Sequence, residues 1–179
     1  QSADYAGLPM DIARTPHAKI IYDFLADPVA EELNVMKSSA AAMTSTLIAA
    51  CLGVLKNRPR NILYLIGNQQ EARKMANRYW KPWIRQTFGD AVADDEEQAA
   101  LHLKVNGVNL ISGSPTEKMM RGIQFSIIIE DESDTMSNVL GGGRQTLEEA
   151  ERERVKNTLR SKIIRLCTPL KKWNKDRPK

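Results

Sequence analysis

Two short stretches of the chain carry residue types that could bind and hydrolyse a nucleotide. The first, IIIEDES at residues 127–133, is an apolar run that ends in three consecutive acids. Hydrolysis of a nucleoside triphosphate needs one carboxylate for Mg²⁺ and another for the attacking water. We assign the metal to Asp131 and the water to Glu132, with Glu130 as a competitor for either role. Taken alone, the stretch is equally consistent with a solvated strand end.

The second stretch, VMKSSAAAMTS at residues 35–45, has the rhythm of a phosphate-binding loop. An ordinary loop reads GxxxxGK[ST], in which backbone N–H groups surround the phosphates, the lysine neutralises them and the hydroxyl binds Mg²⁺. Thr44 fits the hydroxyl position, but Ala42 and Met43 stand where the glycine and lysine are expected. The nearest cation is Lys37, whose long side chain could reach phosphates from the other end of the loop.

A plain helix start, with Ser38 or Ser39 as the cap, is the alternative interpretation of this loop, and the motif alone favours it. Backbone donors do not need glycine where the local dihedral angles suit alanine. If the loop does bind ATP, we expect the contacts to come from one continuous run: Lys37, Ser38, Ser39, Ala40, Ala41, Ala42, Met43, Thr44 and Ser45.

Strand and helix patterns alternate along the chain and predict the elements that position both stretches. Strands are expected at 31–36, 61–67, 125–132 and 161–169, with a hairpin at 101–114 that turns at Asn106-Gly107. Helices are expected at 16–26, 44–56, 69–86 with a kink at Pro82, and 146–160, whose neighbouring opposite charges suggest intrahelical pairs. The alternation predicts an α/β fold with a mainly parallel sheet, whose ligands bind at the carboxyl ends of the strands.

The composition is that of an ordinary globular domain, with 179 residues, 42% hydrophobic and 27% charged. The net charge of +4 permits an acidic partner such as nucleic acid without requiring one. The two cysteines lack CxxC spacing, which argues against a zinc site or a disulfide framework. No apolar run is long enough to cross a bilayer, so we expect no membrane association.

Five segments, in this order, resemble the ATPase (motor) domain of terminase large subunits, the DNA-packaging motors of tailed bacteriophages, and especially the lambda-type branch. RTPHAKIIYDFLADP resembles the leading helix, although His17 replaces the usual aromatic. VMKSSAAAMTS resembles that branch's deviant loop, in which the late lysine can be absent, and NILYLIGNQQEARKM resembles the next strand and helix. MMRGIQFSIIIEDESD resembles "RG", an apolar strand and "DE-x-D", and RLCTP resembles the "STP" coupling motif, with Cys167 in place of serine.

The resemblance implies a P-loop NTPase fold of the ASCE or RecA-like kind, which uses ATP and Mg²⁺. Residues 1–170 would form the ATPase domain, with an irregular lead-in at 1–15, and residues 171–179 a basic tail or linker. Thr168 resembles the coupling residue that senses the γ-phosphate, and Arg121 resembles the arginine that reaches the ATP of a neighbouring subunit. The other carried-over roles are the loop lysine for Lys37, the Mg²⁺-side hydroxyl for Thr44, the metal carboxylate for Asp131 and the catalytic carboxylate for Glu132.

The resemblance also implies partners and a setting. Double-stranded DNA, the portal protein and the small terminase subunit are expected partners, with a homo-oligomeric ring on the procapsid in the cytoplasm of the infected bacterium. A nuclease domain usually follows such a motor, but no cluster of acids after residue 135 suggests one, so we expect it to be absent from this chain. Two alternatives stay open: a helicase-like translocase, and an ATPase-dead module that binds DNA or the portal.

Overall fold

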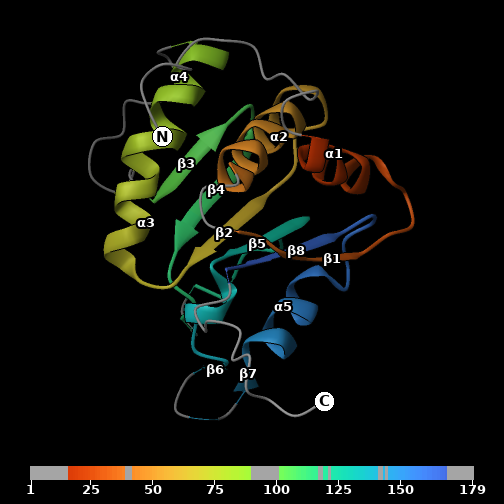
Figure 1. Cartoon of the computed structure of the whole chain (residues 1–179), viewed down its shortest axis with the longest axis vertical. Coiled ribbons are helices and arrows are strands. Elements are labelled where there is room, and N and C mark those ends of the chain that lie inside the picture. The colour runs from red at the N-terminus through yellow and green to blue at the C-terminus, as the bar shows by residue number, and fades with distance from the viewer. Residues whose placement is uncertain are drawn as a thin grey trace.

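A six-stranded sheet forms the centre of the described part of the molecule (Figure 1). The computed structural model describes residues 16–38, 42–89, 101–116, 119–120, 122–140, 143 and 145–168, without the side chain of His17. The strands are β1 (Glu32–Met36), β2 (Ile62–Ile66), β3 (His102–Val105), β4 (Val108–Gly113), β5 (Ile127–Asp131) and β8 (Lys162–Cys167). They lie in the order β1-β8-β5-β2-β4-β3, and β3 alone pairs antiparallel, with β4.

Helices cover both faces of this sheet (Figure 1). One face carries the 3-10 turn η2 (Pro16–Ala18), α1 (Lys19–Ala26), α2 (Met43–Asn57), α3 (Gln69–Met75), the π-helical segment η3 (Ala76–Trp80) and α4 (Lys81–Phe88). The other face carries α5 (Leu147–Val155), which contacts a small antiparallel sheet of β6 (Val139–Leu140) and β7 (Gln145–Thr146). The 3-10 helix η5 (Ser133–Thr135) follows β5 directly. The arrangement confirms the predicted α/β fold and is consistent with a P-loop NTPase.

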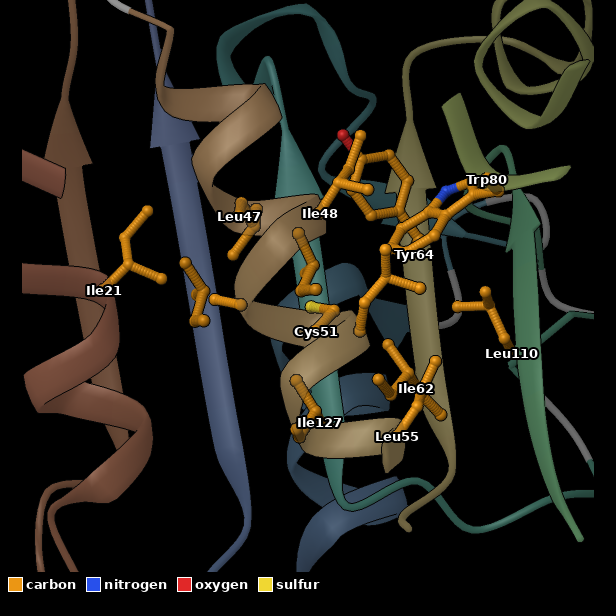
Figure 2. Close-up of a cluster of buried hydrophobic side chains, with 14 of the residues drawn as sticks. Ile21, Leu47, Ile48, Cys51, Leu55, Ile62, Tyr64, Trp80, Leu110 and Ile127 are labelled. Atoms are coloured by element: carbon orange, nitrogen blue, oxygen red, sulfur yellow. The ribbon is translucent and has the colours of Figure 1, made fainter. Parts of the chain in front are cut away.

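Alternate residues of the central strands enter two separate hydrophobic cores. Tyr64 and Ile129 belong to the core beneath α2, which Figure 2 shows in detail, whereas Leu63 and Ile128 belong to the core beneath α5. Every residue of β2 and β5 is buried, which explains the uninterrupted apolar runs in their sequences. The same alternation sends neighbouring residues at a strand end to opposite faces of the sheet.

Most predicted elements appear at the predicted places, including the hairpin. Asn106 and Gly107 have φ values of 50° and 81°, the left-handed conformations that a two-residue hairpin turn requires. The predicted helix at 69–86 forms, and its hydrogen-bond pattern is irregular just before Pro82, in the π-helical segment that ends at Trp80. Because proline has no N–H for the carbonyl one turn earlier, the hydrogen-bond pattern changes before it.

The last helix is shorter than predicted, and its expected intrahelical pairs form between Glu148 and Arg152 and between Glu153 and Lys156. A capping box between Thr146 and Glu149 starts the helix as expected, but α5 ends at Val155 and turns follow to residue 160. One of its acids, Glu151, is fully buried. The short strands β6 and β7 were not predicted at all.

The predicted lead-in at 1–15 and the predicted tail at 171–179 lie outside the described residues. Within the described ranges, we find no helix with both the length and the apolar character that a bilayer crossing needs.

Candidate nucleotide site

The parallel strands bring the carboxyl ends of β1, β8, β5 and β2 to one edge of the sheet. In register, Met36 of β1 lies beside Cys167 of β8, and Asp131 of β5 lies between Leu166 and Ile66. The backbone N–H of Lys37 donates to the carbonyl of Cys167 at 2.8 Å, which extends the β1–β8 pairing to the first residue of the loop. Segments that are far apart in the sequence therefore meet here.

Three of the predicted site residues make direct contact at this edge. The Lys37 Nζ donates to Asp131 Oδ1 at 2.6 Å and to Thr44 Oγ1 at 3.0 Å. The Thr44 hydroxyl in turn donates to Asp131 Oδ2 at 2.7 Å. The side chains of Lys37 and Asp131 are only 10% and 2% exposed, so their ion pair is shielded from water. A cation, a hydroxyl and a carboxylate thus form one hydrogen-bonded cluster.

Tyr64, which we did not predict as a site residue, completes this cluster. Its hydroxyl donates to Asp131 Oδ2 at 2.6 Å, and its buried ring meets Trp80 edge-on at 5.5 Å (Figure 2). Burial, followed by the charge of Asp131, raises the pKa of Tyr64 well above its ordinary value, so the hydroxyl keeps its proton. In the sequence, the one indication of such a role for Tyr64 is that its hydroxyl is the single polar side-chain group in the otherwise aliphatic strand ILYLI.

The loop begins helix α2 without a side-chain cap. Ala42 is the N-cap residue in a left-handed conformation, φ 55° and ψ 14°, so the alternative of a helix capped by Ser38 or Ser39 is wrong. Positive φ is normally the place of a glycine, which is the residue that ordinary phosphate loops carry at this position. Residues 39–41 of the predicted contact run lie outside the described residues.

The first turn of α2 offers backbone donors near Asp131. The N–H of Thr46 donates to the carbonyl of Ala42 and is the first intrahelical donor, so the N–H groups of Met43, Thr44 and Ser45 have no acceptor within the helix. Met43 is 3% exposed and packs in the core, so its side chain is not available to a ligand. Such a helix start favours anions.

Glu132 and Thr168 follow the ends of two adjacent strands. Glu132 is exposed, has φ 61°, and accepts hydrogen bonds at its carbonyl from the N–H and hydroxyl of Thr135. The Thr168 N–H donates to Asp134 Oδ1 at 3.3 Å. Asp134, the last residue of the "DE-x-D" pattern, therefore joins the turn after β5 to the end of β8.

The turn after β5 also packs over the end of β2. A Cβ atom placed on Gly67 would lie 2.8 Å from the Thr135 Oγ1, closer than real Cβ contacts. A glycine at this position allows the backbone just after β2 to approach η5, which begins directly after Glu132.

Glu130 does not share this site. It points to the opposite face of the sheet, where its carboxylate accepts from Arg165 Nε at 3.0 Å. Glu151 lies beside it, and burial together with the neighbouring Glu130 carboxyl raises the pKa of Glu151 to about 9. Of the three consecutive acids, Asp131 and Glu132 are left at the predicted site.

The residues present fit a Mg²⁺ ion. Magnesium in nucleotide sites is held by one or two carboxylates or hydroxyls and by phosphate oxygens. Asp131 and Thr44 supply such oxygens 2.7 Å apart, beside a helix start that favours phosphate. Arg121, the arginine expected to act in a neighbouring subunit, lies outside the described residues.

Comparison with known proteins identifies the family. A search of curated proteins found no match. The family model for the phage terminase large subunit gpA, ATPase domain, matches residues 6–174, which include the sheet, the helices and the whole polar cluster. The chain therefore belongs to the family of ATPase domains of phage terminase large subunits.

Proposed function

We propose that this chain hydrolyses ATP and couples each cycle to the translocation of double-stranded DNA into a procapsid. The observation that carries the proposal is the contact of Lys37, Thr44 and Asp131, which come from three separate segments. These groups lie at the carboxyl edge of a parallel sheet, the place where nucleotides bind in such folds. Membership of a terminase ATPase family supports ATP as the nucleotide.

In this proposal the start of α2 and the cluster of Lys37, Thr44 and Asp131 bind different parts of the Mg²⁺–ATP complex. Lys37 neutralises phosphate charge, and the N–H groups that begin α2 donate to phosphate oxygens. Thr44 and Asp131 would hold Mg²⁺, which would supply positive charge to offset that of the phosphates. Tyr64 fixes the orientation of the Asp131 carboxylate through the 2.6 Å hydrogen bond to Oδ2.

Glu132 acts as the general base in hydrolysis. It orients the attacking water and accepts its proton, while the water oxygen bonds to the γ-phosphorus and the bond to the β–γ bridging oxygen breaks, releasing ADP. Its exposure and its left-handed backbone, φ 61°, support this role, because strained backbone is concentrated at functional sites. Arg121 of a neighbouring chain stabilises the charge that develops on the phosphates.

Thr168 links hydrolysis to movement in the proposed cycle. It lies one residue after β8, and its N–H contacts the carboxylate of Asp134 from the turn that carries Glu132. A change at the γ-phosphate is thus transmitted to the strand through Thr168. The proposed partners are double-stranded DNA, the portal protein, the small terminase subunit and further copies of the chain in a ring, in the cytoplasm of an infected bacterium. Residues 1–170 form the motor domain, and 171–179 a tail or linker.

Steady-state ATP hydrolysis over a wide range of protein concentration tests the proposal. Lys37→Ala and Glu132→Gln should each lower kcat by at least about 100-fold, because each removes a group used in the transition state. The matched controls are Lys74→Ala and Glu153→Gln, whose side chains are 62% and 53% exposed on the surface, and they should retain wild-type turnover. Wild-type turnover in Glu132→Gln would refute the assignment.

A mixing experiment tests the arginine from the neighbouring chain. Arg121→Ala and Lys37→Ala should each be inactive alone, but a mixture should recover part of the turnover, because the Lys37→Ala chain supplies an arginine to the intact site of its neighbour. If the mixture recovered no ATP turnover, Arg121 would not act on the ATP of a neighbouring chain. A wild-type chain that binds DNA without hydrolysing ATP would favour the ATPase-dead module, and strand separation of a duplex would favour a helicase-like translocase.

A further inference from the structure

Behind the nucleotide site, on the α5 face of the sheet, Arg165 binds three glutamate side chains at once. Its Nε donates to Glu130 Oε1 at 3.0 Å, its Nη1 to Glu32 Oε2 at 3.3 Å, and its Nη2 to Glu151 Oε2. The Glu130 and Glu151 side chains are 6% and 0% exposed, and that of Arg165 is 16% exposed. All three nitrogens of the guanidinium are engaged.

Each member of this network comes from a different element. Arg165 lies on β8, Glu130 on β5, Glu32 on β1 and Glu151 on α5. In the strand register, Arg165 lies directly between Asn34 of β1 and Glu130 of β5. One guanidinium therefore joins three neighbouring strands and the helix that covers them.

The same three strands carry the nucleotide site on their other face. Asp131 is the residue after Glu130, Thr168 comes three residues after Arg165, and Lys37 follows β1. A shift of one strand against its neighbours would change the contact between the Lys37 Nζ and Asp131 Oδ1, which is 2.6 Å. The network lies where it can prevent such a shift.

We propose that Arg165 is a positioning residue, which locks β1, β5 and β8 together so that Lys37, Asp131 and Thr168 meet at the nucleotide edge. This role rests on the proposed function, because what it positions is the ATP site. The planar guanidinium has donors in fixed directions, whereas a lysine ammonium is a compact point charge that cannot reach three glutamate side chains on three elements. Replacing a buried ion-pair network with apolar residues often leaves stability unchanged, so the network is better explained by fixing an arrangement.

The test compares Arg165→Lys with Arg152→Lys. Arg152 also pairs with Glu32, at 3.2 Å, and with Glu148, but its side chain is 60% exposed and it has no contact with Glu130 among the described residues. Arg165→Lys should lower kcat for ATP at least about tenfold while KM changes less than about threefold, because misplaced catalytic groups reduce turnover more than binding. The control should behave as wild type.

Hydrogen exchange measured by mass spectrometry supplies a second readout that does not depend on turnover. In Arg165→Lys, peptides that cover β1, β5 and β8 should exchange at least about tenfold faster, while those of α3 and α4 keep wild-type rates. Acceleration spread equally over the chain would make Arg165 a general stabiliser and overturn the proposal. Unchanged exchange at the three strands would overturn it as well.

The two readouts separate this proposal from the proposed function. If the wild-type chain does not hydrolyse ATP, the proposed function fails, and the exchange rates alone decide whether Arg165 locks the strands. If Arg165→Lys does not fold, Glu32→Gln replaces it, because that side chain is 31% exposed and its loss leaves the buried pairs intact. Glu32→Gln should speed exchange in β1 about threefold, and Glu148→Gln, which removes only another Arg152 contact, should not.

Discussion

Removing the hydroxyl group of Tyr64 tests whether its hydrogen bond to Asp131 stabilises the candidate site. Tyr64→Phe deletes the donor that reaches Asp131 Oδ2 at 2.6 Å and leaves the ring in place. The ring is fully buried and keeps its edge-on contact with Trp80, so the substitution creates no cavity. Any change in stability therefore comes from the lost hydrogen bond.

The expected size follows from the partners of Asp131. A hydrogen bond to a charged group contributes about 1.5–3 kcal/mol. Lys37 and Thr44 still donate to the carboxylate in the variant, so it is not left without partners. We therefore expect a loss of about 2 kcal/mol in the free energy of unfolding. With an m value of about 2 kcal/mol/M, the urea midpoint falls by about 1 M.

Urea unfolding followed by circular dichroism measures this loss. Tyr79→Phe is the matched control, because its hydroxyl has no hydrogen bond among the described residues, and it should change the free energy of unfolding by less than about 0.5 kcal/mol. A double-mutant cycle with Asp131→Asn should give a coupling energy of about 1 kcal/mol, since asparagine keeps an acceptor oxygen but loses the charge. A midpoint for Tyr64→Phe that equals the wild-type midpoint would refute the reasoning.

Two further substitutions test the loop and the buried acid. Ala42→Gly should stabilise the chain by up to about 1 kcal/mol in urea unfolding, because it relieves a left-handed alanine. Ala49→Gly, inside α2, should instead destabilise it by about 1 kcal/mol. If the two glycine substitutions changed the free energy of unfolding equally, the backbone of Ala42 would not be strained. Because the pKa of Glu151 is raised from 4.5 to about 9, the native state holds a proton that the unfolded chain releases, so stability should fall as pH rises through this window. Glu151→Gln should flatten that fall, by up to about 1.4 kcal/mol per pH unit, and an unchanged slope would contradict a protonated Glu151.

The sequence was sufficient to predict an element wherever its local residue pattern agrees with its burial in the fold. The apolar runs of β2 and β5 are fully buried, the Asn106-Gly107 turn has the required positive φ values, and Thr146 forms the capping box that starts α5. Lys37, Thr44 and Asp131 could also be placed together, because parallel strands bring their carboxyl ends to one edge.

The features that were missed depend on contacts between distant segments. β6 and β7 have two residues each, too few for a periodic pattern, and they exist because they pair with each other. Tyr64 lies 67 residues from Asp131 in the sequence, so only the three-dimensional structure shows that its hydroxyl contacts the carboxylate. Glu151 is part of a charged helical run, and only Arg165 on β8 explains how it can be buried.

The deviant loop shows why spacing and geometry can disagree. In GxxxxGK[ST] the lysine lies next to the hydroxyl, but here residue 43 is a methionine that packs in the core. The lysine instead follows β1, seven residues before Thr44, and its long side chain returns to the hydroxyl and to Asp131. The sequence order has changed, yet the cation still lies within hydrogen-bond reach of the hydroxyl and the carboxylate. Such a site is therefore better identified from the contacts among its side chains than from the interval between its letters.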